Sequence, residues 1–227
     1  MNCGAVAIWH DIAPEGLAEF HAWHGEEHMP ERVGIPGFVR GRRFVAIEAD
    51  LGYFNLYDTA SPEVVNGPDY KARLDNPTPR TLSAVRHFRN VARSLCEIVA
   101  RTGDAQGGVV ATLRHDVADG RDAEHIERMT GQVMRGLAAM PGVASVALLV
   151  ADKAASSYVN AEQRARGAAN RVPPYILVVE GWCEEEAFIR HLQGHFNAAA
   201  CAELAISTEH SLGFYRHQLT VNPATST

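Results

Sequence analysis

The pattern of apolar and polar residues divides the chain into short elements, and the same series of elements occurs twice. Apolar runs at residues 5–12 and 109–117 are typical of strands, and each is followed by helical spacing, at 14–29 and 122–140. Further strands are predicted at 38–48, 53–59 and 93–100 in the first series, and at 143–152, 175–181 and 214–221 in the second. A second helix is predicted to open at Ser61-Pro62 and at Glu184.

Short motifs support an internal repeat. His10-Asp11-Ile12 recurs 105 residues later as His115-Asp116-Val117, and Pro36-Gly37 recurs at the same offset as Pro141-Gly142. Further along, the offset becomes 122 residues, because Tyr53-Phe54-Asn55-Leu56 corresponds to Tyr175-Ile176-Leu177-Val178. The change of offset predicts an insertion at 153–171, and the small and polar residues there indicate a loop.

Each series has the order β-α-β-β-α-β, which is the ferredoxin-like unit. We therefore predict an α+β protein of two tandem ferredoxin-like units, 1–103 and 107–227, whose antiparallel sheets face each other and enclose a barrel. Two independent domains are the alternative. The short linker between the units favours close apposition.

Composition excludes several classes of protein. The chain has 227 residues, of which 46% are hydrophobic and 21% charged, and its net charge of −6 predicts no nucleic-acid partner. No apolar run approaches the roughly 20 residues that cross a bilayer, so no membrane association is expected. The four scattered cysteines form no C-x-x-C pair, which predicts a reducing, cytoplasmic location.

A cluster of histidines is the main candidate for chemistry. The helical pattern places His24 and His28 on the stripe of Leu17 and Phe20, which should face the sheet, with His21 at its margin. Packed polar side chains are the favoured interpretation of His21 and His24. His28 lies at the predicted end of the helix, where the helix dipole favours an imidazolium and the side chain can reach a pocket.

A metal site is the competing interpretation. His24 and His28 are four residues apart and could chelate an ion, with Glu27 or Glu31 assisting. The H-E-x-x-H arrangement is absent, however, and Pro30 is expected to end the helix where a third ligand would follow. We therefore predict no metal.

The strand at 38–48 carries three arginines among apolar residues. Alternation places Arg40 and Arg42 on one face with Phe38 and Phe44, and Arg43 on the other face. A buried guanidinium needs a partner, which could be an anionic ligand or a carboxylate. An internal salt bridge is favoured, and the candidate carboxylates are Glu27, Glu31 and Asp58.

The segment Trp23-x4-His28-x-Pro30, followed by Pro36-Gly37-Phe38 and the arginine-rich strand, resembles the EthD-like group of the dimeric α+β barrel superfamily. The resemblance covers residues 5–100. The second half matches in its elements but has Val133 at the position of His28. The resemblance implies a cofactor-free pocket between sheet and helices that takes a small-molecule ligand, with His28 as the catalytic acid or base. Its expected substrate-binding residues are Trp23, His24, Arg43 and Tyr57.

Two functions follow from this resemblance. The first is a cofactor-free enzyme that acts on a small cyclic or aromatic metabolite by isomerisation, cyclisation or proton transfer. The second is a non-catalytic small-molecule-binding or stress-associated barrel protein. Haem-binding relatives would place a histidine on a helix of the second half, which makes His191 and His195 candidates, although a surface pair is favoured. A homodimer of the two-unit chain is a further expectation.

Overall fold

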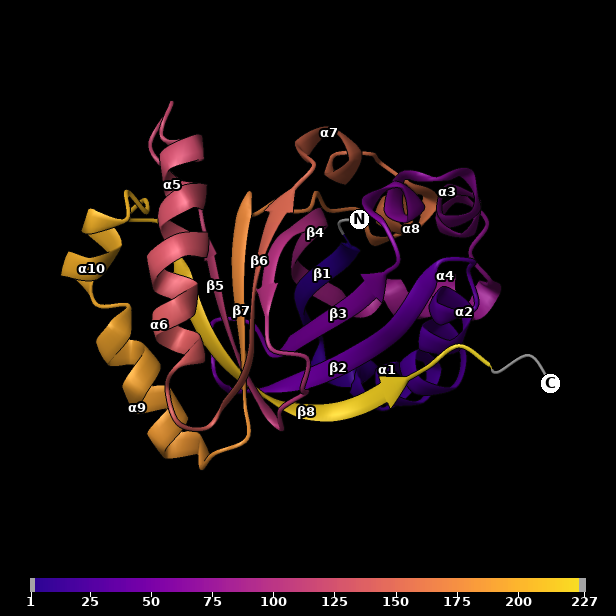
Figure 1. Cartoon of the computed structure of the whole chain (residues 1–227). Coiled ribbons are helices and arrows are strands. Elements are labelled where there is room, and N and C mark those ends of the chain that lie inside the picture. Colours follow the sequence, from indigo (N-terminus) through magenta and orange to yellow (C-terminus); the bar gives the residue numbers. More distant parts are fainter. Residues whose placement is uncertain (1–2, 225–227) are drawn as a thin grey trace.

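The computed structural model describes residues 3–224 and shows one closed antiparallel barrel of eight strands (Figure 1). Around the barrel the strands follow the order β1-β3-β2-β8-β5-β7-β6-β4. The predicted α+β fold with facing sheets is confirmed. The strands are β1 (Cys3–Ile12), β2 (Phe38–Glu48), β3 (Tyr53–Thr59), β4 (Phe88–Thr102), β5 (Val109–His115), β6 (Val143–Ala151), β7 (Tyr175–Gly181) and β8 (Ser211–Val221). We call β1 to β4 with their helices the first half, and β5 to β8 with theirs the second half.

The two halves share the barrel because β2 pairs with β8 and β4 pairs with β6. Aromatic side chains fill the interior, and the ring centroids of Trp9 and Phe54 stack 4.8 Å apart. The Trp9 indole Nε1 donates a hydrogen bond to Thr112 Oγ1 across the barrel, at 3.1 Å. A barrel of eight strands is just wide enough to be filled by side chains in this way.

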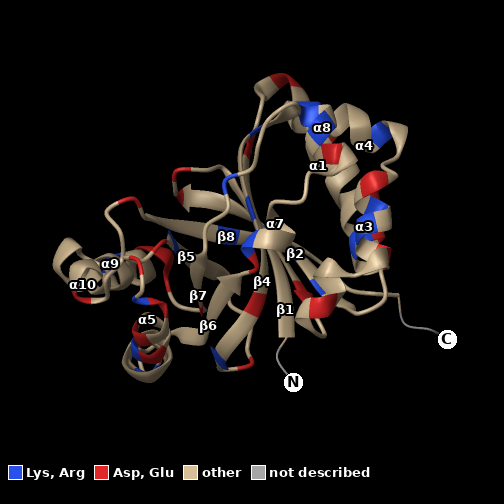
Figure 2. Cartoon of the chain, turned by 90° about the horizontal axis from the view of Figure 1, so that it is seen from above, with Lys and Arg blue, Asp and Glu red and all other residues tan. Residues whose placement is uncertain are grey.

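The helices lie outside the barrel in two groups on opposite sides (Figure 2). The first half is covered by α1 (Leu17–Trp23), α2 (Met29–Val33), α3 (Pro68–Asp75) and α4 (Pro79–Ala84), and the second by α5 (Asp122–Arg128), α6 (Met134–Ala138), α9 (Glu185–His195) and α10 (Ala198–Glu203). No helix within residues 3–224 is long and apolar enough to cross a membrane.

The helix that carries the histidines does not end at Pro30, so that prediction is wrong. α1 and α2 are joined by a π-helical turn at His24–His28, in which the Met29 amide donates to the His24 carbonyl oxygen. Pro30 then occupies the first turn of α2, where a missing N–H is tolerated. The second half has the same π turn at Met129–Val133, again 105 residues later and without a proline. The turn therefore occurs at the same point in both series of elements.

The insertion at 153–171 is not the loop that its composition indicated. It contains two short helices, α7 (Lys153–Ser156) and α8 (Ala161–Arg166), and lies over the first half (Figure 1). Both of its ends are hydrogen-bonded to β4. The Asp152 amide donates to Leu95 O at 2.8 Å, and the Arg171 amide donates to Val91 O at 3.0 Å.

Strict alternation along β2 also fails near its start. The register shifts between Phe38 and Arg40, as in a β-bulge. As a result Phe38 packs beneath the helices beside Tyr57, whereas Phe44 points into the barrel. Ser61 precedes a 3₁₀ turn at Pro62–Asn66, as expected of an N-cap residue, but its side chain makes no capping hydrogen bond.

Candidate active site

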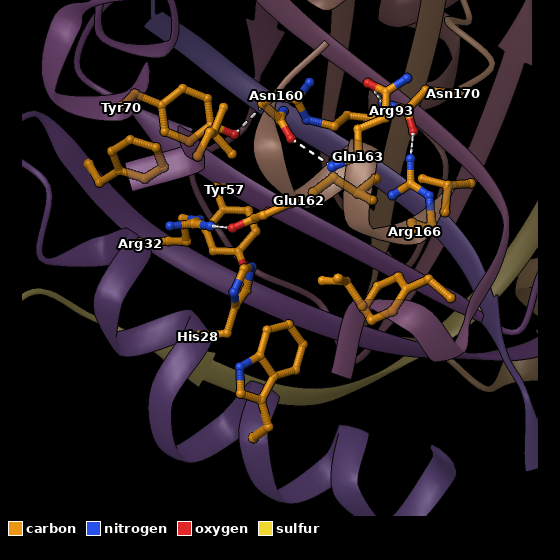
Figure 3. Close-up of a pocket in the computed structure, with 17 residues that line it drawn as sticks. His28, Arg32, Tyr57, Tyr70, Arg93, Asn160, Glu162, Gln163, Arg166 and Asn170 are labelled. Atoms are coloured by element: carbon orange, nitrogen blue, oxygen red, sulfur yellow. Dashed lines mark hydrogen bonds and ion pairs between the residues drawn. The ribbon is translucent and has the colours of Figure 1, made fainter. Parts of the chain in front are cut away.

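A small cavity lies between the outer face of the first sheet, the helices of the first half and the insertion (Figure 3). Its volume of about 60 Å³ is room for roughly four water molecules. Its polar and aromatic lining comes from elements far apart in the sequence: Trp23, His28, Arg32, Phe38, Tyr57, Tyr70, Phe88, Arg93, Asn160, Glu162, Gln163, Arg166 and Asn170. The insertion therefore completes a pocket whose other walls belong to the first half.

His28 projects from the π turn into this cavity. The residue is 8% exposed, and its Nδ1 atom is buried with no hydrogen-bond partner. Its ring lies 4.4 Å from that of Trp23 and stacks on His24 at 5.4 Å. Burial, and secondarily the charge of Arg32, hold the pKa of His28 well below its ordinary value. The expectation of a dipole-stabilised imidazolium is wrong, because the helix continues to Val33 and encloses the ring.

Tyr57 lies near His28 in the close-up and is also without a polar partner (Figure 3). Its hydroxyl is buried, and burial raises the pKa of this phenol far above its ordinary value. At neutral pH Tyr57 therefore keeps its proton and can donate a hydrogen bond to a ligand. The neutral imidazole of His28 can accept one.

Arg32 connects the helices to the insertion. Its guanidinium forms an ion pair with Glu162 of α8 and a longer contact with Glu31 at 3.4 Å. Burial, the largest single effect, would lower the pKa of Arg32, but the charges of Glu162 and Glu31 and the nearby phenols of Tyr70 and Tyr57 together outweigh it and raise the pKa. This ion pair fixes α8 over the cavity.

Two other arginines of the cavity form no ion pair with any carboxylate in the described part of the chain. Arg93 donates from Nη2 to the Tyr70 hydroxyl at 3.1 Å, while its Nη1 is buried and unpartnered. Arg166 donates to the side-chain oxygen of Asn170 and to Ala168 O, while its Nε is buried and unpartnered. Burial lowers the pKa of the Arg166 guanidinium, the nearby charge of Arg93 lowers it further, and the smaller effect of Glu162 opposes both.

The structure brings together only part of the predicted substrate-binding set. Trp23 and Tyr57 line the cavity with His28, whereas His24 and Arg43 do not. Arg43 Nη1 donates to His24 Nδ1 at 3.3 Å, and its guanidinium lies 5.4 Å from the centre of the Phe20 ring. Burial, and then the charge of Arg43, lower the pKa of His24 well below its ordinary value. The ligand-binding roles of His24 and Arg43 stay predictions.

The internal salt bridge expected for the arginines of β2 is present. Arg42 is almost fully buried and pairs with Glu180 at 2.7 Å and with Asp58 at 3.4 Å. Asp58 also accepts from Arg40 at 2.6 Å and from Arg101 at 2.9 Å. Asp58 was among the candidate partners. Glu180 was not, because it comes from β7 in the other half.

The other expected ligand groups are engaged elsewhere or exposed. Glu31 pairs with Arg73 at 3.3 Å, and Glu27 accepts from Thr78 at 2.5 Å. No group of three or more His, Cys, Asp or Glu residues within 3–224 is placed to hold a metal ion. His191 is exposed on α9, and the two histidines of that helix lie outside the cavity.

In the second half, as far as residue 224, the corresponding positions form an apolar core in place of this polar cavity. At the offset of 105 residues, His24, His28 and Arg32 correspond to Met129, Val133 and Leu137. All three of these are buried in one apolar core, together with Val179 at the position of Tyr57. The same positions therefore form a closed apolar core in the second half and carry unpartnered polar groups, those of His28 and Tyr57, in the first half.

A larger and more open depression, about 690 Å³ in volume, lies at one end of the barrel. Arg114, His115 and His210 of its wall already have polar contacts within the protein. Arg114 pairs with Asp50, the two rings of His115 and His125 join through their Nε2 atoms at 2.9 Å, and His210 contacts Ser207 O at 2.8 Å. The small cavity is therefore the better candidate site.

The four charged residues of the cavity, Arg32, Arg93, Glu162 and Arg166, were not predicted from the sequence. Arg32 follows His28 by four residues on the same helical face, and Glu162 and Arg166 share that spacing in the insertion. The spacing of four residues could have indicated that the two members of each pair share one face of a helix. Nothing in the sequence shows that Arg93 and Arg166 meet, because they approach only after the insertion folds back over β4.

Comparison with known proteins identifies the architecture. No family profile matches the chain, and neither does any curated protein sequence. An anthrone oxidase-like protein of known structure superposes with a TM-score of 0.63 at 14% identity, over 97% of this chain and 93% of that one. A candidate monooxygenase from Lactobacillus acidophilus NCFM gives 0.57 at 10% identity, over 98% and 97%. A candidate chlorite dismutase gives 0.54 at 9% identity, over 96% of each chain. At these identities the likeness shows a shared fold, the α+β barrel of ferredoxin-like sheets.

Proposed function

We propose that this chain is a cofactor-independent enzyme that transfers a proton on a small cyclic or aromatic metabolite, with His28 as the catalytic base. One observation carries the proposal. The Nδ1 atom of His28 is buried without a partner in a cavity, whereas its counterpart Val133 fills an apolar core. An unpartnered buried polar atom costs roughly 1–3 kcal/mol, and a bound ligand would supply the partner.

The chemistry divides between two groups. The neutral imidazole of His28 takes a proton from the substrate, and the phenol of Tyr57 donates a hydrogen bond to the oxygen on which negative charge develops. His28 then returns the proton to another atom, which completes an isomerisation or follows ring closure. Both groups are free of other polar partners, so binding breaks no existing hydrogen bond.

The EthD-like assignment and the tandem arrangement belong to this proposal. The segment from Trp23 to Phe38 supports the first, and the recurrence of both the element order and the π turn supports units at 1–103 and 107–227. The anthrone oxidase-like neighbour fits an aromatic substrate. The cytoplasmic location and the homodimer stay predictions, and light scattering of the purified chain measures the latter.

A screen of small cyclic acids and lactones by NMR, for both binding and conversion, tests the proposal. His28→Gln should lower turnover by about 100-fold or more, the usual contribution of a general base. The matched control is His191→Gln on the exposed face of α9, which should behave as the wild type. Binding without conversion by the wild type would instead assign the non-catalytic alternative.

A further inference from the structure

Arg93 and Arg166 line the cavity, and within residues 3–224 neither forms an ion pair with a carboxylate. We propose that they bind the carboxylate of a small organic acid, which makes the substrate an anion. This inference rests on the proposed function and names its substrate class. Figure 3 shows His28 and Tyr57 on the side of the helices, and the two arginines toward the insertion.

Arg93 provides one of the two guanidinium groups of this carboxylate site. The residue is 7% exposed, and within residues 3–224 its guanidinium has one hydrogen-bond partner, the neutral hydroxyl of Tyr70, which leaves Nη1 free for a ligand. Its backbone is held in place because its amide donates to Arg171 O at 2.8 Å. The end of the insertion thus holds the backbone of β4 from which the Arg93 side chain projects.

Arg166 supplies the second half from α8. Its Nη2 is used by Asn170 and Ala168, both neutral acceptors, and its Nε is free. α8 is itself anchored on the first half, since Asp75 Oδ1 accepts from the Ala161 amide at 3.2 Å. The position of Arg166 is therefore defined before any ligand binds.

The charge balance of the cavity favours an anion. Among residues 3–224, Glu162 is the one carboxylate that lines the cavity; it forms its ion pair with Arg32 and acts on Arg166 without direct contact. By contrast, the buried Arg42 and Arg114 each have a carboxylate partner within the part of the chain that the structure describes. Two partly desolvated like charges without a counter-ion are unfavourable, and a carboxylate between them would form charge-assisted hydrogen bonds with both.

The volume of the cavity limits the size of the ligand that can bind while the insertion is closed over it. About 60 Å³ accommodates a group the size of acetate, whereas a cavity that binds benzene measures about 150 Å³. A carboxylate therefore fits directly, and a cyclic acid would need the insertion to move outward. Once its carboxylate is held at the arginines, the rest of the substrate would extend toward His28 and Tyr57.

Binding of acetate to the full-length chain tests this inference. Acetate, acetamide and inorganic phosphate are titrated separately while the arginine Nε–Hε signals are followed by NMR. We expect acetate to shift the signals of Arg93 and Arg166, and neutral acetamide at equal concentration to shift neither. Arg93→Gln and Arg166→Gln should each weaken acetate binding about tenfold or more. Arg164→Gln, an exposed arginine on the same helix, is the matched control.

Several outcomes would overturn the inference: equal binding of acetate and acetamide, no acetate binding, unchanged affinity in both glutamine variants, or tighter binding of phosphate than of acetate. If Arg93→Gln does not fold, Arg93→Lys, which keeps the charge, replaces it and should retain part of the affinity. His28→Gln should bind acetate as the wild type does. If His28→Gln loses turnover but still binds acetate, both the catalytic role of His28 and the carboxylate site are supported. If turnover depends on His28 but the wild type does not bind acetate, only the carboxylate site is overturned.

Discussion

Burial in the neutral form is the common property of the histidines beneath the first sheet. His10, His24 and His28 are all buried, and burial is the largest cause of the lowered pKa of each, to about 3 in the case of His10. In the unfolded chain these groups have a pKa near 6.5. Folding therefore releases protons at acid pH, which links stability to pH.

Stability should accordingly fall as the pH drops below about 6.5. A histidine whose folded pKa is depressed contributes stability that is present above the unfolded pKa and is lost as the pH falls toward the folded pKa. His28→Val removes one such group. Below pH 6.5 the free energy of unfolding of this variant should therefore fall less steeply than that of the wild type, and the two slopes should differ by up to about 1.4 kcal/mol per pH unit. Urea unfolding of both proteins at pH 7, 6 and 5 measures the slopes. Parallel slopes would show that His28 titrates normally in the folded chain.

At neutral pH the two neighbouring histidines should respond differently to substitution. His28→Val should leave stability unchanged or slightly higher, because it removes an unpartnered polar atom and introduces the residue found in the second half. His24→Ala should cost about 1–3 kcal/mol, since His24 packs against Phe20 and accepts from Arg43. Chemical unfolding at pH 7.5 compares them. The reverse order would assign the cavity role to His24.

At the level of elements, the insertion determines whether the cavity is closed. α8 is held over the first half by the ion pair of Glu162 with Arg32 and by hydrogen bonds to Asp75. Segments that open locally exchange their amide hydrogens faster than the rest of the fold. The strength of this closure can therefore be measured residue by residue.

Glu162→Gln should raise amide exchange in 153–171 by about tenfold or more while β2 and β3 remain protected. The substitution leaves Arg32 buried with only the longer contact to Glu31, and a broken buried pair is strongly destabilising. Glu124→Gln, which removes an exposed carboxylate on α5, is the control. Equal protection of the insertion in wild type and Glu162→Gln would show that the ion pair does not hold α8.

The sequence predicted the strands of this element series well, because alternation and apolar runs depend only on neighbouring residues. The range at 53–59 coincides with β3 and the range at 175–181 with β7. The helix ends and the insertion were less predictable. A π turn lets a proline enter without breaking the helix, and the short helices of the insertion are stabilised by contacts with distant residues such as Asp75.

At the scale of the whole molecule, the halves should unfold together. Backbone pairing of β2 with β8 and of β4 with β6 crosses between them, as does the buried pair of Arg42 with Glu180. We expect one denaturant transition that coincides for fluorescence and circular dichroism. Glu180→Gln should lower its midpoint through about 3–5 kcal/mol of lost stability. Two separate transitions would show that the halves fold independently.

The candidate site illustrates what a sequence leaves out at this scale. His28, Trp23 and Tyr57 were predicted because their motif and strand are local features of residues 21–59. Arg93 and Arg166 reach the same cavity only through the closed barrel and the folded insertion. The positive charge of the cavity therefore depends on tertiary structure and could not be predicted. The candidate for proton transfer, His28, could be predicted from a local sequence motif.

Deuterium exchange tests the central claim, that His28 moves protons on a bound small molecule, most directly. Small cyclic acids and lactones are incubated with the protein in D₂O, and exchange at carbon next to the carbonyl is followed by NMR. Wild-type protein should exchange at least one of them well above the buffer rate, and His28→Gln should reduce this by about 100-fold or more while His191→Gln does not. Exchange that persists in His28→Gln, or that is lost equally in His191→Gln, would contradict the assignment of His28 as the base.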